Sequence, residues 1–208
     1  MPGILYIISA PSGAGKTSLL NRVLQNQLIC NIQLSISYTT RKIRSGEFNK
    51  EHYFFVSQEK FKNMIENDFF LEYAKVFGHY YGTSKKIIEN ILSSGVDVLL
   101  DIDWQGAQQI RKKYSNSCSI FIVPPSMKEL SRRLHSRKKE SKRIIENRML
   151  QAELEIMHYI EYDYLIVNDC FNSALNDLKS VVESERLRID KNNKMYHNIF
   201  ISNLLNNF

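Results

Sequence analysis

The chain has 208 residues, of which 43% are hydrophobic, and a net charge of +6. This length accommodates one α/β core with insertions, and no apolar run reaches the length of a membrane helix or a secretory signal. The charge suits a small anionic ligand or a nucleic acid.

Three cysteines, Cys30, Cys118 and Cys170, lie far apart in the sequence. They form no C-x-x-C pair, and no histidine stands at zinc-binding spacing from them. We therefore expect reduced, buried thiols, which favours a cytoplasmic protein.

The first predicted unit is a strand at Ile4–Ser9, a glycine-rich turn and a helix that extends to about Asn26. The turn, residues 10–17, reads Ala-Pro-Ser-Gly-Ala-Gly-Lys-Thr. Gly13 and Gly15 allow successive main-chain N–H groups to point inward, and the helix adds the positive end of its dipole. The turn is therefore expected to bind a polyphosphate.

Lys16 and Thr17 make this P-loop motif chemically specific. Lys16 would contact the β- and γ-phosphates of a nucleotide, and the Thr17 hydroxyl would ligate Mg²⁺. Ala10 stands in place of the first glycine of the general motif. An ordinary Gly/Ser-rich turn would explain the glycines, but not a Lys-Thr pair that opens a helix after a buried strand.

A small, strand-rich insertion is predicted next, from about residue 35 to residue 83. It contains a basic stretch that ends in a Ser-Gly turn, residues 39–47. Strands are predicted at Gln33–Tyr38, Tyr53–Val56 and Phe69–Val76, a helix at Gln58–Asn67 and a turn at Gly78–Thr83.

The α/β pattern then resumes with a helix between Ser84 and Gly95 and a strand at Val96–Leu100. This strand leads into Asp101 and Asp103, at the edge where an open α/β sheet binds its ligands. The remaining predicted elements are a helix at Trp104–Lys113, strands at Ser119–Val123 and Tyr164–Val167, a helix after Asp169 and a short terminal helix at about 199–205. Strands that alternate with helices predict an α/β fold, a parallel sheet covered by helices.

The segment Ser126–Tyr159 is helical by pattern and carries the net positive charge of the chain. Between Lys128 and Arg148 there are nine lysines and arginines against three acidic residues. Such a segment can be a solvated helical face, a nucleic-acid-binding patch or a lid that closes over phosphates. Composition alone favours the solvated face.

Arg41, Arg44, Tyr53 and Tyr81 in the insertion offer donors that suit a second phosphate group. Each of them alone is more often part of a solvated turn or of the core, but their joint presence beside a P-loop favours binding. A triphosphate site beside a monophosphate site is what phosphoryl transfer requires, because that reaction depends on positioning and charge neutralisation.

The chain resembles the guanylate kinases from residue 4 to about residue 190. A P-loop alone indicates only a superfamily, whereas the matching runs in their order are specific to this family. The runs are SAPSGAGKT at 9–17, SISYTTR at 35–41, GE at 46–47, EHYFF at 51–55, VFGHYYGT at 76–83, LDIDWQGA at 100–107 and YLIVND at 164–169.

This resemblance implies an ATP:GMP phosphotransferase of purine nucleotide metabolism that uses ATP and Mg²⁺, accepts GMP and dGMP, and has neither nucleic-acid nor membrane partners. It implies no particular oligomeric state. It divides the chain into a P-loop core (1–34, 84–125 and 159–208), a GMP-binding insertion (35–83) and a basic helical lid (126–158).

The same resemblance implies a role for each matching residue. The ATP-binding set is Ala10, Pro11, Ser12, Gly13, Ala14, Gly15, Lys16, Thr17, Arg137 and Asn168. The GMP-binding set is Ser37, Arg41, Arg44, Tyr53, Glu72, Tyr81, Thr83 and Asp103, in which Ser37, Glu72 and Thr83 would read the guanine edge. The catalytic set is Lys16, Arg41, Arg133, Arg137 and Arg148, and the metal set is Thr17 and Asp101, with Asp101 acting through water. Asp103 is open between a guanine contact and support of the metal.

Two features depart from the family pattern. Lys50 stands in place of a glycine before Tyr53, which predicts a different local turn. The lid stretch 138–143 is unusually basic.

Three alternatives remain open. A related module that binds a phosphorylated peptide without catalysis typically lacks the P-loop lysine or the lid arginines, which this chain keeps. A nucleic-acid binder would interleave aromatic residues with the basic ones, and here few do so. A kinase for another monophosphate is the nearest alternative, and Glu72 with Ser37 decides between the two.

Overall fold

The structure is a computed structural model that describes residues 3–25, 31–136, 142–188, 201–202 and 204–205. Cys30, Arg137 and most of the expected terminal helix at 199–205 lie outside these ranges. None of the helices within them combines the length and the apolar character that a membrane crossing requires.

A parallel sheet of five strands forms the centre of the molecule, in the order β2-β7-β1-β8-β9. Its strands are β1 (Leu5–Ser9), β2 (Ile32–Leu34), β7 (Asp97–Asp101), β8 (Cys118–Val123) and β9 (Tyr164–Val167). The central strand β1 is buried along its whole length because its side chains alternate between two apolar cores. Tyr6 and Ile8 face one core, and Leu5 and Ile7 face the other.

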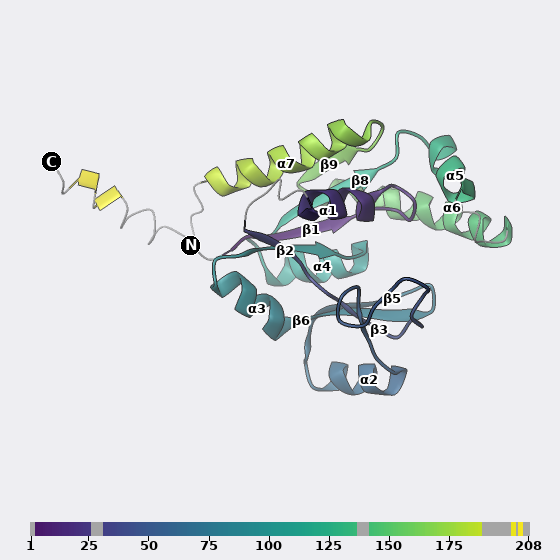
Figure 1. Ribbon diagram of the computed structural model, residues 1–208, viewed down its shortest axis with the longest axis horizontal. Coiled ribbons are helices and arrows are strands. Elements are labelled where there is room, and N and C mark those ends of the chain that lie inside the picture. The colour runs from purple at the N-terminus through teal and green to yellow at the C-terminus, as the bar shows by residue number, and fades with distance from the viewer. Residues whose placement is uncertain (1–2, 26–30, 137–141, 189–200, 203, 206–208) are drawn as a thin grey trace.

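Helices cover both faces of this sheet, as Figure 1 shows. Leu19 of α1 and Leu178 of α7 pack against Tyr6 and Ile8 on one face, and Ile88 of α3 and Ile110 of α4 pack on the other. The helices are α1 (Lys16–Gln25), α3 (Lys85–Ser93), α4 (Trp104–Lys113) and α7 (Phe171–Leu187). The predicted fold class, a parallel sheet covered by helices, is therefore confirmed.

A second sheet of four strands, in the order β4-β3-β6-β5, lies below the first in Figure 1 together with α2. Its elements are β3 (Tyr38–Thr39), β4 (Phe54–Phe55), α2 (Gln58–Glu66), β5 (Phe70–Val76) and β6 (His79–Ser84). The long hairpin of β5 and β6 forms most of this sheet.

Two expectations about this region are wrong. The predicted turn at Gly78–Thr83 is strand β6, and the turn itself consists only of Phe77 and Gly78, with φ of +47° and +83°. Two positive φ values match the tight turn that follows the twist of a hairpin. The single strand expected at Gln33–Tyr38 is divided between β2 and β3, because the chain crosses from one sheet to the other at residues 35–37.

The described residues of the basic segment, 127–136 and 142–159, are helical as predicted and project beyond one end of the central sheet (Figure 1). It comprises α5 (Met127–Ser136), α6 (Lys142–Ile156) and the short 3-10 helix η1 (Met157–Glu161). Leu130 and Leu134 of α5 pack with Ile145 and Ala152 of α6 in a small core of their own. The division of the chain into three domains stays a prediction.

The cysteines differ in their surroundings. Cys118 is buried on β8, as expected, but Cys170 is exposed. The expectation of a buried thiol is wrong for Cys170 because this residue caps the N-terminus of α7, outside the sheet.

Candidate functional site

The P-loop follows β1 and has a backbone that requires its glycines. Gly13 and Gly15 have φ of +101° and +97°, a region that side chains disfavour. A Cβ atom on Gly15 would collide with the Asn168 amide, and one on Gly13 would press on two leucines of α5. Ala10 stays outside the left-handed region, so its methyl group fits without backbone strain.

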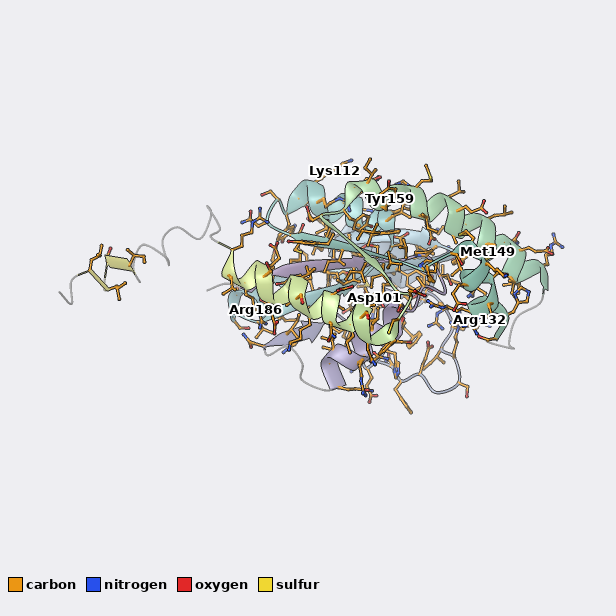
Figure 2. All side chains as sticks on the ribbon, turned by 90° about the horizontal axis from the view of Figure 1, so that it is seen from above. Asp101, Lys112, Arg132, Met149, Tyr159 and Arg186 are labelled. Atoms are coloured by element: carbon orange, nitrogen blue, oxygen red, sulfur yellow. The ribbon has the colours of Figure 1, made fainter. Side chains whose placement is uncertain are left out.

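Lys16 extends from the start of α1 to the carboxyl end of β7. Its Nζ forms an ion pair with the Asp101 carboxylate and donates to the Ile102 carbonyl oxygen at 3.4 Å. Figure 2 shows Asp101 near the middle of the molecule, well apart from Arg132 and Met149 of the basic segment. The structure thus brings together a predicted phosphate ligand and a predicted metal ligand.

Thr17 and Asp101 supply a hydroxyl and a carboxylate, which are oxygen donors of the kind that Mg²⁺ prefers. Within the described ranges, no group of three or more His, Cys, Asp or Glu side chains could enclose a metal ion. These residues therefore fit a Mg²⁺ ion that takes most of its ligands from phosphates and water.

The basic segment contacts the P-loop through two of its predicted arginines. Arg133 donates to the carbonyl oxygens of Ala14 at 3.3 Å and Asn168 at 2.9 Å, and Glu129 orients its guanidinium. Asn168 is buried and donates to the Ala14 carbonyl oxygen at 2.7 Å. From α6, Arg148 donates to the Ser12 hydroxyl at 3.3 Å. The third predicted arginine, Arg137, lies outside the described residues.

The predicted monophosphate site is organised around Arg41. This guanidinium is buried and forms two hydrogen bonds to the Glu47 carboxylate, at 2.7 and 3.0 Å. The Tyr53 ring lies 5.4 Å from it, and the Tyr81 ring lies 6.0 Å from that of Tyr53. Arg44 is exposed, and only its main-chain N–H joins the cluster, through Glu47.

Glu47 is one residue that the sequence reasoning missed. Its carboxylate holds the Arg41 guanidinium in place through two hydrogen bonds, and this guanidinium in turn lowers the pKa of Glu47. The available signal was the Gly-Glu pair at 46–47 within the matching runs.

Lys50, the residue in place of a glycine, has φ of +70°. Its main-chain N–H donates to the Tyr53 carbonyl oxygen at 2.8 Å. Lys50 thus adopts the left-handed conformation that a glycine favours, and the expected difference from the turn of the family stays a prediction.

The predicted guanine-reading residues form a buried polar cluster. Glu72 of β5 accepts a hydrogen bond from the Thr83 hydroxyl at 2.6 Å, and both residues are buried. Asp103 caps the N-terminus of α4, and a Cβ on Gly106 of that helix would collide with Glu72. Burial raises the pKa of Glu72 to about 7, and the nearby Asp103 carboxylate adds to this rise. Ser37 is buried at the crossing between the sheets, where its carbonyl oxygen accepts from Phe54.

Tyr53 connects the two halves of the site. Burial and the nearby Asp101 carboxylate raise the pKa of this phenol to about 12. The Asp101 carboxylate at the end of β7 thus acts electrostatically on a monophosphate candidate that precedes β4 of the second sheet.

Glu155 on α6 is a second residue that the sequence reasoning missed. It lies near Lys16 and Asp103, and the main-chain N–H of Ser12 acts on its carboxylate as a hydrogen-bond donor. Burial raises its pKa to about 7, although Lys16 lowers it. The available signal was its spacing of seven residues from Arg148, which places both on one face of α6 toward Ser12.

We expect the Glu155→Gln protein to gain stability relative to the parent as the pH rises. The folded pKa lies above the ordinary carboxyl value, so the parent loses stability between about pH 4.5 and pH 7 as this proton leaves. The difference in free energy of unfolding between variant and parent should grow by about 2 kcal/mol from pH 5 to pH 8.5. Denaturant titrations at both pH values measure it, with exposed Glu153→Gln on the same helix as the control. A difference that stays constant with pH would contradict the shifted pKa.

Comparisons with known proteins agree with this geometry. The sequence model of the guanylate kinase family matches residues 3–185. Guanylate kinases of Escherichia coli and Photorhabdus laumondii are 57% and 58% identical to the chain over 203 residues, and each match covers 98% of both sequences. The crystal structure of guanylate kinase from Anaplasma phagocytophilum superposes with a TM-score of 0.73 at 34% identity, covering 90% of this chain and 88% of that one. The chain belongs to the guanylate kinase family.

Proposed function

We propose that this chain transfers the γ-phosphoryl group of ATP to GMP, and also to dGMP, in purine nucleotide metabolism. The observation that carries the proposal is the buried Glu72. This carboxylate is paired with Thr83 and faces the start of α4, on the sheet next to Tyr53, whose phenol is influenced by the Asp101 carboxylate of the P-loop site. Carboxylate oxygens match the two adjacent donors of a guanine edge, the ring N–H and the exocyclic amino group.

The two phosphate sites have separate tasks in this reaction. Lys16 would exchange the Asp101 carboxylate for oxygens of the β- and γ-phosphates, while Arg41, Tyr53 and Tyr81 hold the phosphate of GMP. Glu47 already fixes the Arg41 guanidinium, so little ordering remains when the phosphate binds. The GMP phosphate is itself an anionic nucleophile, and the site needs no strong general base.

Mg²⁺, when bound, neutralises charge on the phosphate oxygens, and Thr17 and Asp101 are the residues that would hold it. Asn168 and the P-loop main chain would position ATP. The hydrogen bond from the Asn168 side chain to the Ala14 carbonyl oxygen also holds the P-loop in place.

We propose that the basic segment is a lid rather than a nucleic-acid-binding patch. Two of its arginines, Arg133 and Arg148, contact the P-loop and its Asn168 neighbour instead of forming an outward-facing surface. The chain also keeps Lys16, whose loss is typical of modules that bind peptides without catalysis.

The free thiols Cys118 and Cys170 favour the cytoplasm.

A coupled assay of ADP release tests the proposed function. ATP and Mg²⁺ are supplied with GMP, dGMP, AMP, CMP or UMP in parallel reactions. We expect turnover with the two guanine nucleotides and little with the others. Equal use of several bases, or none of any, would contradict the proposal.

The lid can be tested separately by hydrogen exchange. A lid should open locally without ligands and become protected when both nucleotide sites are filled. We expect slower exchange in α5 and α6 when a bisubstrate analogue of ATP and GMP is added. Protection that follows addition of DNA or RNA instead would favour the nucleic-acid patch.

A further inference from the structure

The strand that carries Glu72 lies at the edge of its sheet, and α4 covers that edge. β5 pairs with β6 on one side only, and its register shifts between Phe70 and Glu72. An irregularity of this kind changes the direction of the side chains beside it, so the direction of Glu72 depends on how the main chain is held there. The Thr83 hydroxyl of β6 contacts one side of the Glu72 carboxylate, and the opposite edge of β5 remains open to contacts from α4.

Two side chains of α4 hold the free main chain of β5. The Gln109 amide accepts from the Tyr73 N–H at 3.2 Å and donates to the Tyr73 carbonyl oxygen at 2.7 Å. One helical turn later, the Lys113 ammonium donates to the Leu71 carbonyl oxygen at 2.7 Å. The Gln109 amide thus pairs with the strand edge as the peptide group of a neighbouring strand would.

These contacts lie on either side of Glu72 in the sequence. Asp103 caps the same helix, which places Gly106 against the Glu72 carboxylate. A single rigid element therefore holds the main chain at 71 and 73 and also borders the side chain at 72.

We propose that Gln109 and Lys113 are positioning residues for base selection, which hold the strand on both sides of Glu72 so that its carboxylate stays directed at the guanine edge. The inference rests on the proposed function, because it concerns the same GMP site. Neither residue touches the nucleotide in this scheme.

The burial of these groups favours a positioning role over a purely structural one. Tyr73 is 40% exposed, so water can replace the two hydrogen bonds that it forms with Gln109 at small cost in stability. Leu71, whose carbonyl oxygen accepts from Lys113, is only 1% exposed, so Gln109 is the cleaner position for the test. The loss of Gln109 should therefore affect the aim of Glu72 more than the fold. Small misplacement of a binding group is enough to weaken recognition severely.

The decisive variant is Gln109→Leu, which removes both hydrogen bonds and keeps a side chain of similar size. The matched control is Gln108→Leu, because the adjacent amide bonds Glu161 instead of β5. We expect Gln109→Leu to raise KM for GMP about 3- to 10-fold and to lower the GMP:AMP ratio of kcat/KM by a similar factor. KM for ATP, kcat at saturating GMP and Tm should stay close to the parent values, as should all values of the control.

Lys113 provides the rescue experiment. Lys113→Met removes the donor and should raise KM for GMP, whereas Lys113→Arg keeps a charged donor and should stay near the parent. An unchanged GMP:AMP ratio in Gln109→Leu overturns the inference. A parallel loss of GMP, AMP and ATP use with a lowered Tm also overturns it, because that pattern indicates damage to the fold. A parent protein that fails to phosphorylate GMP would refute the proposed function itself, and the positioning role with it.

Discussion

Replacement of Lys16 by alanine is expected to lower kcat by roughly a hundredfold or more. The ammonium group is directed at charge that develops between the phosphates, an interaction made mainly in the transition state. In the structure this group is held by Asp101 and the Ile102 carbonyl oxygen, so it is already oriented toward the end of β7. Lys16 would exchange this ion pair for phosphate oxygens when ATP binds, so its reorientation precedes the reaction, and the bound ammonium then stabilises the developing charge without further reorganisation.

The fold should survive this change, since Asp101 is partly exposed and water can solvate its carboxylate when the lysine is removed. The measurements are kcat and KM for both nucleotides, with Tm as the check on folding. Exposed Lys86→Ala on α3 removes the same charge far from the P-loop and should leave kcat unchanged. A Lys16→Ala protein that turns over near the parent rate would refute the P-loop assignment.

Much of the central sheet could be predicted because its strands are continuous apolar runs. The run at Val96–Leu100 predicts a strand that is covered on both faces, and β7 is buried from Asp97 to Leu100. The run at Tyr164–Val167 also forms a strand, but β9 lies at the edge of the sheet, and its Leu165 and Val167 are each 48% exposed. The P-loop could also be predicted, because glycine is the residue type that readily adopts the positive φ found at Gly13 and Gly15.

The predictions of secondary structure were wrong where the local sequence does not determine which strand a segment pairs with. The stretch His79–Ser84 contains tyrosines, a glycine and no long apolar run, and it becomes strand β6 only because β5 and β3 lie on either side of it. The break between β2 and β3 is likewise invisible, since an alternating pattern does not say which sheet each residue joins.

Glu47 and Glu155 could not be recognised as site residues for the same reason. Glu155 acquires its shifted pKa only when α6 packs across the P-loop, and Glu47 acquires its role only when the turn returns to Arg41. Both are ordinary carboxylates in the sequence. Spacing along the chain can place Glu155 on the helix face of Arg148, but the chemistry of both carboxylates comes from tertiary contacts.

The Glu72→Gln protein is expected to lose about ten- to a hundredfold in kcat/KM for GMP, equivalent to about 1–3 kcal/mol of binding in the transition state. The amide replaces one acceptor oxygen with a donor, which then faces a donor of the guanine edge. AMP presents a ring nitrogen lone pair and a C–H there, so it never used the contact and should be affected much less. The GMP:AMP ratio of kcat/KM should therefore narrow.

Loss of the fold would not explain this result. The pKa of Glu72 is raised to about 7 by burial, so its ionisation destabilises the folded state as the pH rises from about 4.5 to 7. Removing that charge should leave Tm at pH 8 equal to or above that of the parent. Exposed Glu66→Gln at the end of α2 is the matched control and should keep the parent ratio.

The raised pKa also predicts how recognition depends on pH. Guanine binds the ionised carboxylate, in which both oxygens accept, so kcat/KM for GMP in the parent should rise as the pH increases through about 7. The phosphate of GMP ionises in the same range, but it does so equally in assays of the parent and of Glu72→Gln. Subtracting the two profiles leaves the contribution of Glu72, and we expect it to disappear below about pH 6 as the carboxyl group takes up its proton. Parallel profiles together with an unchanged GMP:AMP ratio would mean that another residue reads the base.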